Sequence, residues 1–183
     1  MKDCAIGLDV GTSSVKGLLV DAAGTIIAAA SARLGRSVPR PGWMEQNPDD
    51  WWKAAVQVLN TLTVDRNLEI LAISVSGQMH SLVAIDDKGL IVRPAILWCD
   101  QRAQHECDVL AEAYGGEEQV IGALGNPMLT GFTAPALLWL RTNEPEVFSR
   151  IARFCLPKDY LALKLTGKLT TEPSDASGTS LYR

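Results

Sequence analysis

The 183-residue sequence lacks clustered positive charge, closely paired cysteines and any apolar run long enough to span a bilayer. Its net charge is −4, and nucleic-acid binding is not expected because a phosphate backbone needs clustered Lys and Arg. Cys4, Cys99, Cys107 and Cys155 form no C-x-x-C pair, so they indicate reduced thiols rather than a metal or redox motif. No signal peptide precedes the first predicted strand, and we expect a cytoplasmic protein with no membrane contact.

Two common phosphate-binding motifs are also absent, namely G-x-x-x-x-G-K-[ST] and G-x-G-x-x-G. Instead, residues 5–21 read as two strands joined by a short turn that is rich in hydroxyl groups. Residues 15–20 are short and mostly apolar and are followed by another turn, which predicts a hairpin rather than a strand-to-helix connection. An ordinary hairpin without a ligand is the alternative interpretation of this segment.

The turn between these strands suits a nucleotide's phosphates. Gly11 lets the backbone approach an anion closely, while Thr12 and Ser13 offer hydroxyls and turn amides. Lys16 is placed to offset phosphate charge. Asp9 ends the first strand and is a candidate ligand for hydrated Mg²⁺, with the cap of a turn as the alternative.

The remaining pattern predicts the α/β class, with a mixed sheet flanked by helices. Asn47 followed by Pro48 marks the start of a helix over residues 48–62. Trp51 and Trp52 on this helix are expected to be core residues, with a ligand platform as the alternative. Further strands are predicted at 25–29, 68–76 (buried) and 81–85, short apolar segments at 90–92 and 95–98, helices at 103–113, 135–142, 145–153 and 160–165, a loop-rich stretch at 114–135 and a polar tail at 170–182.

Polar clusters directly follow three of the apolar segments, at residues 9–14, 77–80 and 99–102. In open α/β sheets, ligands gather outside the ends of strands. We therefore expect these three clusters to meet at one rim of the molecule.

Several segments together resemble the FGGY carbohydrate kinases, in that family's order along the chain. The segments are residues 7–16, 43–48, 76–80, 94–102, 130–135, 156–160 and 174–179. The first is also shared with actin and the heat-shock chaperone ATPases, whereas residues 77–80 are similar to the branch that acts on D-xylulose. Ala136 is a departure, because the family's first signature usually has Lys there.

The resemblance implies a ribonuclease-H-like (actin-like ATPase) fold, ATP as phosphoryl donor and a ketose, D-xylulose first, as acceptor. It implies that Asp9 associates with Mg²⁺. Binding of the ATP phosphates is assigned to Gly11, Thr12, Ser13 and Lys16. Sugar contacts are assigned to Gln78, Met79, His80, Trp98, Asp100 and Arg102.

Four of these six residues also have an interpretation that does not involve sugar binding. His80 is also compatible with a core histidine, and Met79 with ordinary packing. Asp100 and Arg102 are also compatible with a surface ion pair, which would contribute little to stability.

Kinases of this family are usually more than twice as long. The resemblance implies that residues 1–183 are the N-terminal sugar-binding domain, without the C-terminal ATP-binding domain that carries the general-base Asp. No catalytic residue is therefore assigned in this chain, which is expected to be inactive alone; a homodimer is a further expectation. The alternatives are another FGGY sugar or polyol kinase, an ATPase switch, and a non-catalytic sugar-binding module.

Overall fold

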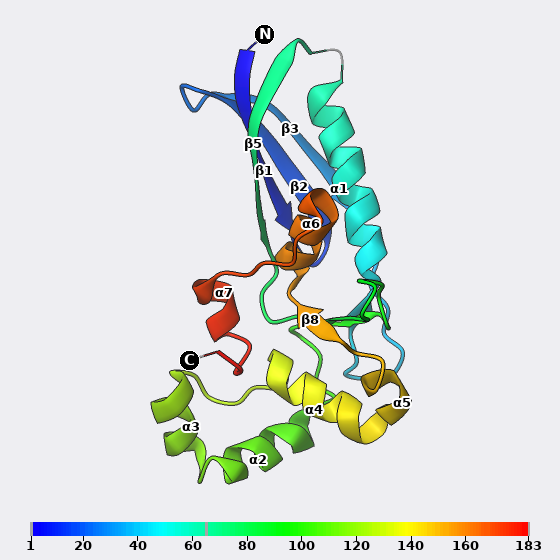
Figure 1. Ribbon diagram of the computed structural model, residues 1–183, viewed down its shortest axis with the longest axis vertical. Coiled ribbons are helices and arrows are strands. Elements are labelled where there is room, and N and C mark those ends of the chain that lie inside the picture. Colours follow the sequence, from blue (N-terminus) through cyan, green and yellow to red (C-terminus); the bar gives the residue numbers. More distant parts are fainter. Residues whose placement is uncertain (1, 65, 183) are drawn as a thin grey trace.

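The computed structural model describes residues 2–64 and 66–182. A 4-stranded sheet in the order β3-β2-β1-β5 occupies one end of the elongated molecule (Figure 1). Its strands are β1 (Lys2–Val10), β2 (Ser14–Asp21), β3 (Ile26–Arg33) and β5 (Leu68–Gly77). β1, β2 and β3 pair antiparallel, whereas β5 runs parallel to β1, so the predicted hairpin and mixed sheet are both confirmed.

Helix α1 (Pro48–Thr63) covers one face of the sheet. The side chain of Asn47 caps it by accepting a hydrogen bond from the Asp49 amide at 3.0 Å, as the sequence predicted. The close packing of α1 on β2 depends on Gly17 of β2, since a Cβ there would lie 2.5 Å from Cγ1 of Val58 on α1. Trp51 is completely buried, which makes it a core residue rather than a ligand platform.

The prediction of a buried strand over residues 68–76 is wrong for the part of the chain that the structure describes. β5 is the edge strand of the sheet, and Leu71 and Ile73 are 64% and 42% exposed. Ile70 and Val75 pack against the core cluster from the same strand. A continuous apolar run usually indicates burial on both faces, but here an irregularity in the register with β1 follows Ile70, and only Leu68, Ile70 and Val75 of β5 pack against the core cluster.

The other half of the molecule holds the remaining elements. They are β4 (Glu45–Gln46), β6 (Val83–Ile85), β7 (Ala95–Ile96), α2 (Gln104–Ala113), α3 (Glu117–Leu124), α4 (Thr133–Asn143), α5 (Pro145–Phe148), β8 (Arg153–Cys155), α6 (Pro157–Thr166) and α7 (Pro173–Ser177). β4 pairs with β7 and β6 with β8, each in a two-stranded sheet. α6 packs against α1 and β5, whereas α2 to α5 lie away from the main sheet (Figure 1).

Three predictions in this half need correction. The stretch predicted as loop-rich contains α3, and the polar tail contains α7. The helix predicted over residues 145–153 ends at Phe148, and strand β8 follows it. Short elements of this kind are stabilised by tertiary packing rather than by local sequence preference.

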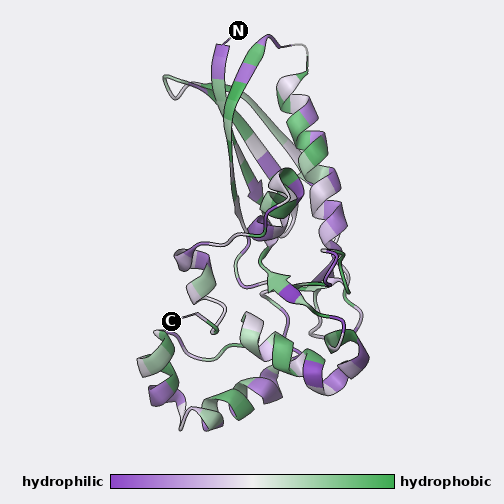
Figure 2. Ribbon diagram, viewed as in Figure 1, coloured by the Kyte–Doolittle hydropathy of each residue, from purple (hydrophilic) through white to green (hydrophobic). Residues whose placement is uncertain are grey.

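Two apolar clusters hold the molecule together. The larger lies between the sheet, α1 and α6, and the smaller joins Ile96 to Trp139 and Leu140 of α4. Apolar residues are frequent along the sheet strands and α4 in Figure 2. Among the helices of the described residues, none has the length and apolar character needed to cross a membrane.

Candidate functional site

The predicted phosphate-binding turn lies between β1 and β2. It is closed by a hydrogen bond in which the Gly11 amide donates to the Ser14 carbonyl at 3.0 Å. The side chains of Ser13 and Lys16 are exposed to solvent. The turn therefore presents a hydroxyl and a cation at the end of the hairpin.

Asp9 lies beside this turn on the face of the sheet opposite α1. Lys16 is its direct partner in the β1–β2 register, and opposite residues in such a pair share one face. The hydroxyl of Ser76 on β5 donates to Oδ1 of Asp9 at 3.1 Å. Among the described residues no group of three or more His, Cys, Asp or Glu could hold a metal. A single carboxylate still suits Mg²⁺, which keeps several waters and completes its shell with substrate phosphates.

A cavity with a volume of about 610 Å³ lies beside three of the predicted sugar contacts. It is lined by Met79, His80, Trp98, Gln101, Gln104, Met128, Leu129, Thr130, Gly131 and Phe132. Three of these, Met79, His80 and Trp98, were predicted from the sequence. The others include every residue from Met128 to Phe132. Residues 130–132 belong to a segment that carries the family resemblance, but no role was assigned to them.

His80 has an unusual environment in this cavity. Its backbone has a φ of 63°, in the left-handed region, and the Thr133 hydroxyl donates to its carbonyl at 3.0 Å. The imidazole packs against the ring of Phe132 with centroids 4.3 Å apart. Burial lowers the pKa of His80 below its usual 6.5, so the neutral ring is favoured near pH 7.

Trp98 and Gln78 connect this cavity to the turn. The Trp98 indole N–H donates to the Thr12 hydroxyl at 3.0 Å, and that hydroxyl lies 3.1 Å from Oε1 of Gln78. Gln78 is 7% exposed and does not line the cavity. Thus the structure brings the turn together with Gln78 and Trp98. Of the third predicted polar cluster, residues 99–102, only Gln101 is among the residues that line this cavity.

Asp100 and Arg102 are placed differently from the sugar contacts predicted for them. Both side chains are 1% exposed, and they form an ion pair with each other at 2.8 Å. The Arg102 guanidinium also lies 3.9 Å from the ring centroid of Trp43 and binds Glu45. Neither residue lines the cavity, so direct sugar contact is not supported by this arrangement.

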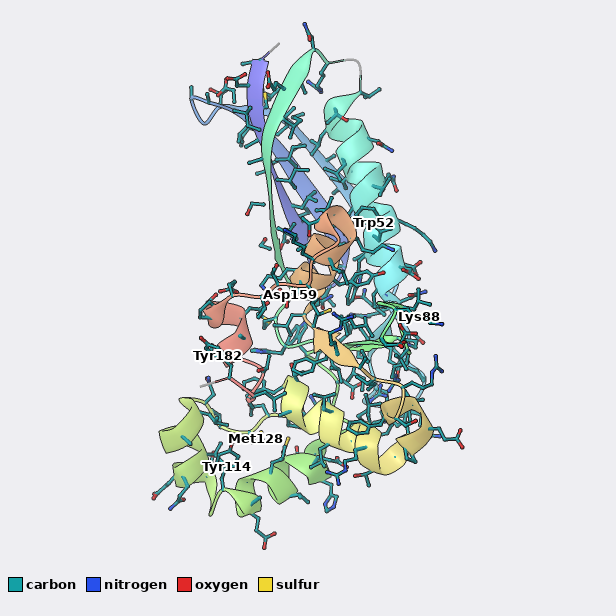
Figure 3. All side chains as sticks on the ribbon, in the orientation of Figure 1. Trp52, Lys88, Tyr114, Met128, Asp159 and Tyr182 are labelled. Carbon is teal, nitrogen blue, oxygen red and sulfur yellow. The ribbon has the colours of Figure 1, made fainter. Side chains whose placement is uncertain are left out.

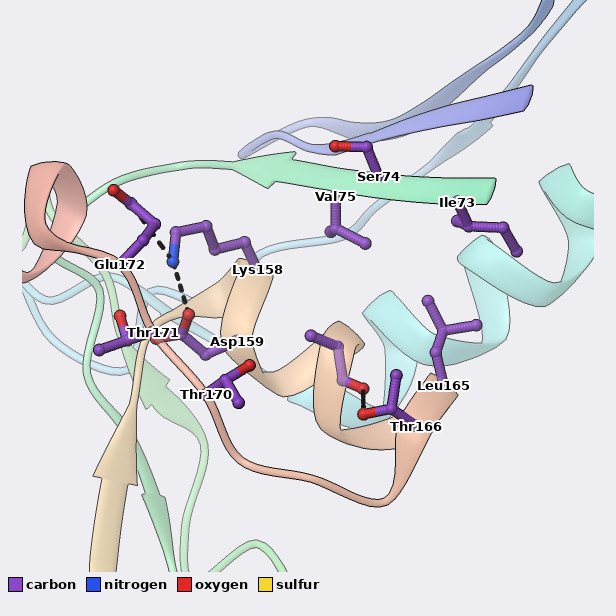
Figure 4. Close-up of a pocket in the computed structure, with 11 residues that line it drawn as sticks. Ile73, Ser74, Val75, Lys158, Asp159, Leu165, Thr166, Thr170, Thr171 and Glu172 are labelled. Atoms are coloured by element: carbon purple, nitrogen blue, oxygen red, sulfur yellow. Dashed lines mark hydrogen bonds and ion pairs between the residues drawn. The ribbon is translucent and has the colours of Figure 1, made fainter. Parts of the chain in front are cut away.

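The sequence reasoning missed a charged cluster beneath β5. Lys158 lies 2.5 Å from Asp159, 3.5 Å from Asp175 and 3.6 Å from Glu172. Asp159 projects from the first turn of α6 (Figure 3), and Figure 4 shows Lys158 between Asp159 and Glu172 in a cavity of 540 Å³. Burial alone would lower the pKa of Lys158, but the carboxylates raise it, so this lysine is held as a cation.

Comparison with known proteins is consistent across sequence and structure. Residues 4–183 match the N-terminal domain of the FGGY family of carbohydrate kinases. The chain is 46% identical over 179 residues to a xylulose kinase of Lactococcus lactis, covering 96% of the chain and 35% of that protein. The corresponding values for a xylulose kinase of Escherichia coli are 43% over 175 residues, 95% and 36%. The chain therefore spans only about a third of the length of these relatives.

Solved structures give the same result. A xylulose kinase from Brucella ovis superposes with a TM-score of 0.91 at 40% identity, over 98% of this chain and 38% of that one. A gluconate kinase from Lactobacillus acidophilus gives 0.92 at 32% identity, over 99% and 37%. These similarities confirm the predicted actin-like ATPase fold. The chain belongs to the FGGY family of carbohydrate kinases.

Proposed function

We propose that this chain is the sugar-binding domain of a kinase that transfers a phosphoryl group from ATP to a ketose, with D-xylulose as the substrate. Support comes from one structural relationship. The cavity beside His80 and the turn beside Asp9 are joined directly by the hydrogen bond from Trp98 to Thr12. A sugar in the cavity would therefore lie next to the phosphate-binding turn.

In this proposal the domain acts mainly through positioning and charge, as is typical of phosphoryl transfer. Thr12, Ser13, Lys16 and the backbone of the Gly11 turn would face the phosphates of ATP. Asp9 would hold Mg²⁺, which neutralises charge on the transferred phosphoryl group. The general base and the adenosine site are assigned to a second domain outside these residues, and closure of the two domains would exclude water.

On the sugar side, we assign Met79, His80 and Trp98 to direct contact. The neutral His80 imidazole can donate or accept one hydrogen bond with a sugar hydroxyl, and Met79 can pack on the carbon skeleton. Asp100 and Arg102 are instead proposed to support the segment that carries Trp98, because their side chains are buried and paired. A cytoplasmic location is part of the proposal, since all four cysteines are unpaired.

The decisive experiment is a substrate panel with a full-length protein that carries this domain. Purified protein is given ATP, Mg²⁺ and one of D-xylulose, D-ribulose, L-ribulose, gluconate or glycerol. D-xylulose should give the highest kcat/KM, and the 183-residue chain alone should give no turnover. Gluconate is the second candidate substrate, because of the structural similarity to a gluconate kinase. ATP hydrolysis that is independent of any sugar would contradict the proposal and favour an ATPase switch.

A further inference from the structure

Lys158, in the first turn of α6, connects that helix to the tail that carries α7. Its Nζ atom lies 2.5 Å from Asp159 on the same helix, 3.6 Å from Glu172 and 3.5 Å from Asp175, and the last two belong to the tail. Figure 4 shows its side chain reaching from α6 to Glu172. The Lys158 side chain is only 13% exposed, so these ion pairs are screened less than surface pairs are.

Asp175 depends on Lys158 more than the other two carboxylates do. Its side chain is 9% exposed, against 47% for that of Glu172. Its Oδ2 atom is buried and makes no hydrogen bond within the described part of the chain. Asp159, by contrast, accepts a hydrogen bond from the Leu156 amide at 3.1 Å. Because a buried carboxylate without a partner is costly, removal of the Lys158 charge should displace Asp175.

The place of Asp175 determines the place of Gly178. The Gly178 amide donates to the Asp175 carbonyl at 3.1 Å, which closes the last turn of α7. At the start of this helix, the Glu172 carboxylate accepts from the Asp175 amide at 2.9 Å. A helix of 5 residues is too short to be stable by itself, so its position depends on contacts with the rest of the molecule.

Gly178 in turn forms one wall of the space that holds the His80 imidazole. A Cβ on Gly178 would lie 2.2 Å from Cε1 of His80, so the tail backbone and the ring are in close contact. Phe132 packs against the ring as well, with centroids 4.3 Å apart. His80 and Phe132 line the proposed sugar cavity, whereas Gly178 does not. The tail therefore influences this cavity from outside, through the imidazole.

Lys158 is also close to the segment that leads into the sugar cavity. A Cβ on Gly77 would lie 3.5 Å from the Lys158 amide nitrogen, so α6 begins beside the end of β5. Lys158, Asp175 and Met79 share the lining of a further cavity of about 430 Å³. Met79 also lines the proposed sugar cavity. The ion pair between Lys158 and Asp175 therefore lies next to the predicted sugar-binding segment.

We propose that Lys158 is a positioning residue for the sugar pocket, which holds α7 through Asp175 so that Gly178 keeps the His80 imidazole in its binding orientation. This role rests on the proposed sugar kinase function and adds a residue to it. It also gives a purpose to residues 174–179, which carry the family resemblance but were assigned no ligand contact. Lys158 itself does not line the sugar cavity.

The test compares Lys158→Met with Lys158→Arg in the full-length protein. Lys158→Met removes the charge and should raise the KM for ketose about two- to tenfold, the effect of losing the one hydrogen bond assigned to His80. The KM for ATP should stay nearly constant. Lys158→Arg keeps the cation and should bring the ketose KM back to near the parent value. Lys168→Met, at an exposed position after α6, is the matched control and should change neither KM.

Two further variants show whether Lys158 acts through His80. In a His80→Ala background, Lys158→Met should raise the ketose KM no further, because changes that act through one contact are not additive. Asp175→Asn removes the partner charge and leaves Lys158 with two carboxylates, so it should reproduce the effect of Lys158→Met and replaces that variant if it does not fold. An equal rise in ketose KM with and without His80 would overturn the positioning role.

Hydrogen exchange separates the positioning role from the proposed function. The backbone amides of residues 174–180 should exchange faster in Lys158→Met than in the parent and in Lys158→Arg. The Cε1–H signal of His80, identified by its loss in His80→Ala, should shift in Lys158→Met. If no ketose is a substrate, the proposed function fails, while these two changes still support the positioning role. Unchanged exchange, an unshifted His80 signal, or an unchanged ketose KM in an enzyme that accepts ketose would contradict it.

Discussion

The imidazole of His80 occupies the space into which a side chain on Gly178 would project. A Cβ on Gly178 would lie 2.2 Å from Cε1 and 2.4 Å from Nδ1 of His80. Phe132 packs against the imidazole as well. Gly178 directly follows α7, so the end of the polar tail contacts a side chain that lines the proposed sugar cavity.

We expect Gly178→Ala to lower the free energy of unfolding by about 1–3 kcal/mol, the usual cost of overpacking. The φ of Gly178 is −76°, which alanine adopts easily, so the cost should come from contact with His80. In a His80→Ala background the cost should therefore disappear. Urea unfolding of both single variants and the double variant measures this dependence.

Gly122→Ala is the matched control for that series. Gly122 lies in α3, and a Cβ there would meet nothing within 4 Å. It should be neutral or stabilising by up to about 1 kcal/mol, because alanine favours a helix over glycine. An equal loss in Gly178→Ala with and without His80 would show that the contact does not determine the cost.

The parts of the fold that were predictable are those with strong local signals. The β1–β2 hairpin follows from two apolar strands around a short polar turn, and α1 from the Asn47 cap and Pro48. α3 was missed because it is short and lies between the positive-φ glycines Gly116 and Gly125, which are also loop signals. The exposure of β5 depends on its place in the sheet, which residues 68–77 do not themselves encode.

The candidate site was predictable only where its residues adjoin an apolar strand. Met79 and His80 lie just after the end of β5, and this position next to an apolar strand allowed the sequence to predict them as site residues. Phe132 and Gly178 act on His80 through tertiary contacts from distant segments. Burial of Arg102 was equally hidden, because it depends on Trp43 stacking against its guanidinium.

His80→Ala should raise the KM for ketose about two- to tenfold, which corresponds to one hydrogen bond to a neutral hydroxyl. The KM for ATP should remain nearly constant. Steady-state kinetics of the full-length protein, with each substrate varied in turn, measures both values. Normal ketose binding by a variant that melts much earlier would identify His80 as a structural residue only.

Asp9→Asn should reduce kcat about a hundredfold or more and leave the ketose KM nearly unchanged. The amide keeps an oxygen that can accept from Ser76 but removes the charge proposed to hold Mg²⁺. Asp3→Asn is a matched control at an exposed position near the other end of β1. Parent-like turnover in Asp9→Asn at saturating ATP and Mg²⁺ would show that Asp9 only caps the turn and does not hold the metal.

Gln46→Leu should lower the free energy of unfolding by about 2 kcal/mol, because it leaves two buried and two partly buried polar groups without their partner. Those groups are the carbonyls of Thr12 and Gly35, the Trp51 indole N–H and the Gln78 amide. Gln57→Leu, at an exposed position on α1, is the same substitution without such partners and should change stability by less than about 0.5 kcal/mol. Equal stability of the two variants in urea would show that the Gln46 hydrogen bonds contribute nothing net to the fold.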